Sequence, residues 1–232
     1  MNNPEITCIM KTWGDHVRLS EETVESFLRQ SYPNKKLLII NTHHDPVLFE
    51  ENYDNIEVIE YPYDFCHLSE KHLYALNKIE TDYWCVMDDD DIYLPWYLEQ
   101  MASLHKKSPQ MEAWSNSHYL YSESNEIKGL RKNGTWVGYM YKKKPVLLEN
   151  VMGAGWDQKI LKKYYKRRIA ETEGPPSWIY RWATGSHHYS GNGGEEQDNS
   201  RYRVRVNNLS LTRAWRPHWD RNYVKDAEEY MR

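Results

Sequence analysis

Short apolar runs alternate with helix-like segments through the first hundred residues, and this alternation constrains the fold of the 232-residue chain more than any other feature. Buried strands are predicted at four apolar runs: 6–10, 37–40, 56–59 and 83–87. Helices are predicted between them, at 20–30, 69–78 and 96–106, the first two capped by Ser20 and Ser69. Strands and helices that alternate in this way form βαβ units, so the sequence predicts an α/β fold with a mostly parallel central sheet flanked by helices.

The second half of the sequence is less regular. Strands are predicted at 135–141 and 201–207, and a basic helix at 156–168. Residues 174–194 are rich in Gly, Pro, His and aromatic residues, and an irregular functional loop is predicted there. The length of the chain suits a single domain with a sizeable core.

Several protein classes are disfavoured by composition. No apolar run approaches the roughly 20 residues of a membrane span, and the N-terminus has no signal-peptide pattern. The three cysteines, Cys8, Cys66 and Cys85, lack metal-ligand spacing and indicate a reducing compartment. We therefore expect a protein without integral membrane association, located in the cytoplasm of the producing or host cell.

The net charge of −4 conceals a strong asymmetry. Residues 1–125 carry 9 basic and 22 acidic side chains, whereas residues 126–232 carry 21 and 12. The chain also has 10 Trp and 19 Tyr but only 3 Phe, and rings with a polar group suit partly wet surfaces that hold sugars or bases. The basic, aromatic second half indicates an anionic partner, although a solvated basic surface would have the same composition.

Four consecutive aspartates, 88–91, follow the fourth predicted strand. Ligands of open α/β sheets bind beyond the carboxyl ends of the strands. Asp88 and Asp90 are two positions apart, so in extended backbone they project to the same side and can share one hard divalent cation, Mg²⁺ or Mn²⁺. The alternative is an acidic turn in which Asp91 caps the next helix. The position directly after a buried strand favours the metal site.

Three stretches in fixed order resemble a known family: ITCIMKTW at 6–13, ESFLRQSYPNKKLLII at 25–40 and YWCVMDDDDIYLP at 83–95. Together they resemble the N-terminal half of family-2 glycosyltransferases, which have the Rossmann-like GT-A fold. The resemblance covers residues 5–100 and is weak beyond them. It implies that a nucleotide-sugar lies over the strand ends and that the aspartates hold a divalent metal on the donor diphosphate.

Donor-binding roles follow from the resemblance, residue by residue. Asn41 lies where the family usually has an Asp that hydrogen-bonds uracil, and because an amide also donates and accepts, a uridine donor remains the expectation. Asp88 would face the ribose and the metal, and Asp90 would ligate the metal. The implied donor-binding residues are Thr12, Trp13, Asn41, Lys71, Asp88 and Asp89.

The resemblance also implies a catalytic carboxylate late in the domain. Asp198 is the first candidate base and Glu196 the second, while Asp157 resembles a family position near the acceptor. An exposed surface acid is the alternative for each of the three. His218 is the expected further metal ligand beside Asp88 and Asp90; it competes with the pair at 187–188, and a packed aromatic cluster is its alternative.

These features predict a single GT-A domain over 1–232, with a nucleotide-sugar donor half at 1–107 and an acceptor half at 108–232. The expected activity is inverting, metal-dependent transfer of a hexosyl or related sugar, with Mn²⁺ or Mg²⁺, from a UDP-sugar to an acceptor hydroxyl. The favoured acceptor is a 5-hydroxymethylated pyrimidine in DNA, as in small virus-encoded members of this class. A surface-polysaccharide or lipid-linked saccharide acceptor, a nucleotidyltransferase and a non-catalytic binding module are the alternatives.

Overall fold

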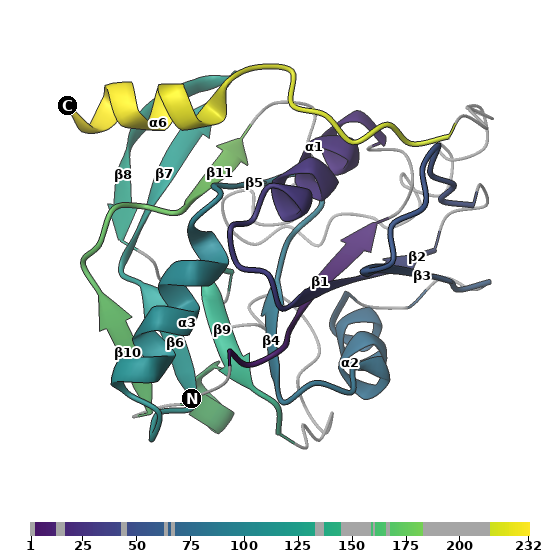
Figure 1. Cartoon of the computed structure of the whole chain (residues 1–232), viewed down its shortest axis with the longest axis horizontal. Coiled ribbons are helices and arrows are strands. Elements are labelled where there is room, and N and C mark those ends of the chain that lie inside the picture. The colour runs from purple at the N-terminus through teal and green to yellow at the C-terminus, as the bar shows by residue number, and fades with distance from the viewer. Residues whose placement is uncertain are drawn as a thin grey trace, which may run out of the picture.

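The main sheet has the strand order β10-β6-β9-β4-β1-β2-β3 (Figure 1). The computed structural model describes residues 3–12, 17–42, 46–62, 65, 68–132, 137–144, 159, 161–165, 168–182 and 214–232. Within these residues the sheet strands are β1 (Ile6–Thr12), β2 (Lys35–Asn41), β3 (Ile56–Glu60), β4 (Tyr83–Val86), β6 (Ala113–Asn116), β9 (Tyr139–Lys142) and β10 (Ile169–Thr172). Only β9 runs against its neighbours, β4 and β6. The predicted mostly parallel sheet is therefore confirmed.

A second, smaller sheet has the order β5-β11-β7-β8. Its strands are β5 (Ile92–Tyr93), β7 (His118–Glu123), β8 (Glu126–Lys132) and β11 (Trp178–Trp182). The β7–β8 hairpin turns at Ser124 and Asn125, which both have positive φ, the backbone that two-residue hairpin turns require. The C-terminal helix α6 (Tyr223–Met231) lies across this sheet (Figure 1).

Helices cover both faces of the main sheet. Consecutive residues of a strand point to opposite faces of the sheet, so the side chains of Trp84 and Cys85 on β4 lie on different faces. The ring of Trp84 lies against His72 of α2 (Leu68–Lys78), whereas Cys85 lies against Tyr97 of α3 (Tyr97–Lys107). The sheet is therefore buried on both sides, as expected of a parallel sheet.

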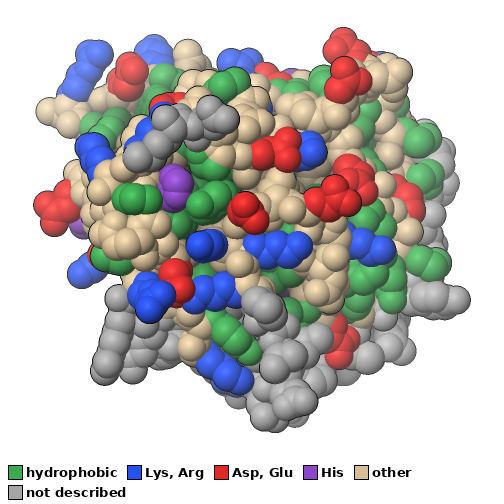
Figure 2. Space-filling model, turned by 60° about the horizontal axis from the view of Figure 1, so that its bottom comes forward, with side chains coloured by type: hydrophobic (Ala, Val, Ile, Leu, Met, Phe, Trp, Pro, Cys, Tyr) green, Lys and Arg blue, Asp and Glu red, His purple; other side chains and the backbone are tan. Residues whose placement is uncertain are grey.

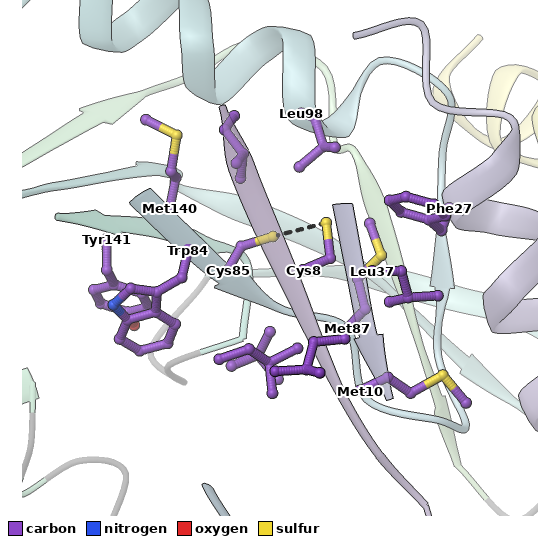
Figure 3. Close-up of a cluster of buried hydrophobic side chains, with 14 of the residues drawn as sticks. Cys8, Met10, Phe27, Leu37, Trp84, Cys85, Met87, Leu98, Met140 and Tyr141 are labelled. Atoms are coloured by element: carbon purple, nitrogen blue, oxygen red, sulfur yellow. Dashed lines mark hydrogen bonds between the residues drawn. The ribbon is translucent and has the colours of Figure 1, made fainter. Parts of the chain in front are cut away.

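The core between the sheet and its helices is close-packed. Cys8 and Cys85 lie in register on β1 and β4, with their sulfur atoms 3.4 Å apart (Figure 3). On the opposite face Trp84 stacks on Tyr141 at 4.3 Å between ring centroids, and both rings are buried. Much of the Trp and Tyr surplus therefore belongs to the core rather than to a binding surface.

The stretch 214–222, here called the C-terminal segment, joins distant parts of the molecule. It begins beside 46–50, where Trp215 forms a parallel bridge with Phe49. It then passes over α1 (Val17–Leu28) before entering α6, as the yellow trace in Figure 1 shows.

The helix caps and one helix differ from the sequence prediction. Helix α1 begins at Val17 and helix α2 at Leu68, so Ser20 and Ser69 are buried residues inside these helices rather than their caps. The predicted basic helix at 156–168 is helical in most of its described residues but is not one regular α-helix: Lys159 is α-helical, and Leu161–Tyr165 form a five-residue π-helix. Strand β10 begins at Ile169, directly after the predicted helix, and pairs with β6.

The region predicted as an irregular loop at 174–194 contains strand β11. This strand pairs with β5 on one side and β7 on the other, which accounts for its run of aromatic residues. The predicted strands at 201–207 and at the start of 135–141 lie outside the described residues. No helix in the described part of the chain is both long and apolar enough to span a membrane.

Candidate functional site

The carboxyl ends of β1, β2 and β3 bring three polar side chains into one row. The strand register places Thr12 opposite Asn41, and Asn41 opposite Glu60. Thr12 and Asn41 are fully buried, and the Asn41 amide donates to Glu60 Oε2 at 2.7 Å. Two of the predicted donor-binding residues therefore lie side by side at the sheet edge where α/β folds bind ligands.

The Asn41 amide is fixed in orientation by its neighbour. Glu60 Oε1 accepts from the backbone N–H of Val47 at 2.7 Å, while Oε2 accepts from Asn41. Because the amide nitrogen of Asn41 faces a carboxylate, an aspartate at position 41 would bring two negative charges together. The departure from the family pattern at position 41 is thus matched by an acid on the adjacent strand.

Two lysines flank the end of β1, Lys71 toward β2 and Lys11 toward the residues that follow β4. Lys71 of α2 is buried, and its Nζ lies 2.5 Å from the carbonyl oxygen of Thr12 and 3.0 Å from Thr42 Oγ1. Lys11 is also buried, and its Nζ lies 3.3 Å from Asp88 Oδ1. The side chain of Lys71 therefore supports the strand ends, and that of Lys11 partly neutralises the aspartates.

The aspartate tetrad, residues 88–91, directly follows β4 and is tied down at several points. The backbone N–H of Asp88 donates to the Tyr93 hydroxyl at 2.8 Å. The Thr23 hydroxyl of α1 lies 2.8 Å from the carbonyl oxygen of Asp91 and 3.3 Å from that of Asp88. The Asp91 side chain accepts from the backbone N–H of Arg181 at 2.9 Å. Asp91 is therefore a buried structural acid and does not cap α3.

The tetrad brings four carboxylates together, and they oppose one another's ionisation. Burial and the neighbouring charges of Asp89 and Asp88 raise the pKa of Asp90 well above its ordinary value, although Arg181 opposes the shift. Asp88 and Asp89 remain half-buried. A carboxylate that is costly to ionise in this way is stabilised by any cation that binds beside it.

The oxygen-only character of the tetrad fits a hard divalent cation. Among the described residues no group of three or more His, Cys, Asp and Glu side chains is arranged to hold a metal. A metal that rests on one or two carboxylates and is completed by substrate phosphates needs no such group.

His218 contacts none of the tetrad residues in the interactions that the structure resolves. Its Nδ1 lies 2.7 Å from the carbonyl oxygen of Arg216, and its Nε2 lies 3.1 Å from Asp220 Oδ1. The Arg216 carbonyl and the Asp220 carboxylate raise the pKa of His218, which favours the protonated ring. A metal ligand must be neutral, so ligation by His218 would require these contacts to change.

Trp13, Asp157, Glu196 and Asp198 lie outside the described residues, so their roles stay predictions. The sequence analysis missed three charged residues that support the tetrad: Lys11, Glu22 and Arg181. All three lie at buried positions of strands or helices. A charged side chain at a buried position requires a partner, and this requirement could have indicated that these residues have structural contacts.

Comparison with known proteins places the chain in a family. Residues 19–169 match glycosyl transferase family 2, which is well over half of the chain. The chain therefore belongs to glycosyl transferase family 2, and the predicted GT-A fold and family are confirmed.

Solved structures of glycosyltransferases share the fold at low sequence identity. The S. aureus TarS 1–349 structure in complex with UDP-GlcNAc superposes with a TM-score of 0.63 and 12% identity, over 82% of this chain and 62% of that one. The mannosyltransferase PcManGT from Pyrobaculum calidifontis, in complex with GDP-Man and Mn²⁺, gives 0.52 and 16%, over 82% and 59%. The chain thus spans about 60% of the length of these proteins. No curated protein matches the sequence.

Proposed function

We propose that the chain transfers a sugar from a nucleotide-sugar, with a UDP-sugar as the expected donor, to an acceptor hydroxyl. The observation that carries this proposal is the position of the aspartate tetrad at the end of β4, beside the buried row formed by Thr12 and Asn41. The fold neighbours support a nucleotide-sugar, since their structures hold UDP-GlcNAc and GDP-Man.

In this proposal Asp90 is the principal metal ligand and Asp88 the second. A bound Mn²⁺ or Mg²⁺ would neutralise negative charge on the leaving diphosphate. Asp88 is the half-buried neighbour of Lys11, so the lysine holds its carboxylate at the sheet edge. Thr12, Trp13, Asn41, Lys71 and Asp89 complete the proposed donor site.

The proposed base is Asp198, with Glu196 and Asp157 as the other candidates. Inverting transfer requires the base to accept the proton of the acceptor hydroxyl, while the hydroxyl oxygen attacks the anomeric carbon opposite the leaving diphosphate. The donor half at 1–107 and the acceptor half at 108–232 follow from this division of roles.

The proposed acceptor is a hydroxyl on a polyanion, a 5-hydroxymethylated pyrimidine in DNA. The excess of basic residues in 126–232 supports it. The three consecutive lysines at 142–144 do not: they lie at the end of β9, beside the amino end of β4 and opposite the tetrad. There the Lys144 ammonium pairs with Glu112 and the Lys143 ammonium donates to the Ile79 carbonyl. Figure 2 shows Lys and Arg side chains in a band on the face it presents, interspersed with acidic ones.

A thermal-shift screen of nucleotide-sugars with Mn²⁺ tests the donor proposal. At a concentration of 100 times Kd the cognate donor stabilises the protein by about 2.7 kcal/mol, or about 5–11 °C in Tm. Asp90→Asn should abolish this shift, and Asp82→Asn should not, because Asp82 is exposed at the opposite end of the same strand. Equal shifts in wild type and Asp90→Asn would exclude the tetrad as the donor site.

Transfer of labelled sugar tests the acceptor. With the donor from the screen, transfer to hydroxymethylated DNA that weakens as salt rises supports the proposal. Transfer only to a saccharide or lipid-linked acceptor would overturn it.

A further inference from the structure

Arg181 of β11 is a deeply buried cation beside the tetrad. It is 2% exposed, and its position on the smaller sheet places it between α1 and the tetrad. A guanidinium is costly to bury unless its charge and its donors are both matched. The partners that Arg181 has acquired therefore indicate what the residue does.

Two of those partners belong to the tetrad. The Arg181 Nε donates to the backbone carbonyl of Asp90, and the backbone N–H of Arg181 donates to Asp91 Oδ1 at 2.9 Å. One residue thus holds both the main chain of the proposed metal ligand and the side chain that follows it. These contacts fix the direction in which the Asp90 carboxylate leaves the backbone.

The third partner supplies the counter-charge. The Arg181 guanidinium forms an ion pair with Glu22 of α1, whose side chain is 3% exposed. Glu22 Oε1 also accepts from the Tyr223 hydroxyl at 2.7 Å and from the backbone N–H of Asp220 at 3.1 Å. Because Glu22 is held by the C-terminal segment and α6, the planar guanidinium has a fixed anchor on the side away from the tetrad.

We propose that Arg181 is a positioning residue for the tetrad, which holds the Asp90 backbone so that its carboxylate is oriented to bind the donor's metal. This inference rests on the proposed function. Arg181 can affect the affinity for the metal in two ways that have opposite signs. As a nearby positive charge, Arg181 repels a metal cation, so its loss would tighten metal binding. As a positioning residue, its loss would weaken metal binding.

The test is a titration with Mn²⁺ alone, followed by the electron paramagnetic resonance signal of the free ion. Arg181→Met removes charge and hydrogen bonds, while Arg181→Lys keeps the charge but lacks the fork that reaches Glu22 and Asp90 together. Both variants should raise the Kd for Mn²⁺ by about tenfold or more. Arg168→Gln is the control, because Arg168 is 65% exposed at the Glu112 ion pair, and its Kd should equal that of wild type.

The outcomes separate this inference from the function on which it rests. If Asp90→Asn binds Mn²⁺ like wild type, the proposed metal site is wrong. If Asp90→Asn loses binding but the Arg181 variants bind as tightly as wild type or more tightly, the positioning role is overturned, even where their Tm falls. Should near-ultraviolet circular dichroism show that Arg181→Met does not fold, the charge-retaining Arg181→Lys decides.

Discussion

Replacement of Glu22 by glutamine tests the electrostatic logic of the buried network without changing its shape. Both hydrogen bonds from the C-terminal side, from Tyr223 and Asp220, reach Oε1, whereas the Arg181 guanidinium pairs with Oε2. A glutamine therefore keeps its carbonyl oxygen toward Tyr223 and Asp220. Its amide NH₂ then faces Arg181, so that a donor meets a donor and the guanidinium loses its counter-charge.

The size of the effect follows from burial. The side chains of Glu22 and Arg181 are 3% and 2% exposed, so water cannot replace the lost partner. Removal of one member of a buried ion pair costs about 3–5 kcal/mol. For a domain of this size each kcal/mol lowers Tm by about 2–4 °C, so Glu22→Gln should lower Tm by about 6–20 °C.

A double-mutant cycle measured by urea unfolding at pH 7 isolates the pair. Arg181→Met leaves Glu22 as the uncompensated buried charge and should be destabilising on its own. The double variant buries neither charge, so it should be more stable than the sum of the single effects predicts, by about 2 kcal/mol or more. Tyr223 and Asp220 keep their contacts with the side chain at position 22 throughout the cycle.

The control is Glu126→Gln, which removes an exposed ion pair with Lys128 and should not change Tm measurably. The reasoning fails if Glu22→Gln costs less than about 1 kcal/mol, or if the two single effects are additive, because a buried pair cannot behave like an exposed one.

Two further predictions concern carboxylates outside this network. Asn41→Asp should destabilise the fold by about 1–3 kcal/mol at pH 8, because a carboxylate replaces the amide donor that lies 2.7 Å from the Glu60 carboxylate. A second change, Glu60→Gln, should restore Tm, and equal Tm values for Asn41→Asp and wild type would contradict repulsion between the two carboxylates. Burial opposes the pKa shift of Glu112, but Lys144 and Arg168 outweigh it and lower that pKa. The carboxylate therefore stabilises the fold above the ordinary pKa of about 4.5 and loses this effect as the pH falls through the folded-state value. Glu112→Gln should lower the free energy of unfolding by about 1 kcal/mol at pH 7 and leave it unchanged near pH 2, as measured by thermal unfolding at several pH values. A stability difference between variant and wild type that did not vary with pH would contradict this prediction.

The first half of the fold was predictable because each element there has its own local signal. Strands β1, β2 and β4 are apolar and buried on both faces, so they read as continuous hydrophobic runs. Strands β6 and β8 carry no such signal. Their sequences, AWSN and EIKGLRK, form strands because neighbours on the sheet supply the pairing.

Predictability of the site divides in the same way. Positions at the ends of strongly predicted strands, such as Thr12, Asn41 and Asp88, could be placed at one edge because parallel strands end together. Arg181 could not, since its contact with Asp91 joins residues 90 positions apart and depends on the pairing of β11 with β5, the two-residue strand that follows the tetrad. Only tertiary packing determines such a contact.

The four consecutive aspartates cannot be told apart by sequence pattern, but they have different environments in the fold. Asp91 is buried and receives the Arg181 backbone N–H, so its carboxylate belongs to the scaffold. Asp88 pairs with Lys11 at 3.3 Å and is partly neutralised before any ligand arrives. Asp90 has its backbone held by Arg181 while the charges of Asp88 and Asp89 oppose its ionisation. A cation bound beside Asp90 would therefore lower the cost of ionising its carboxyl group. Loss of Asp91 should accordingly act on stability first, and loss of Asp90 on metal binding first.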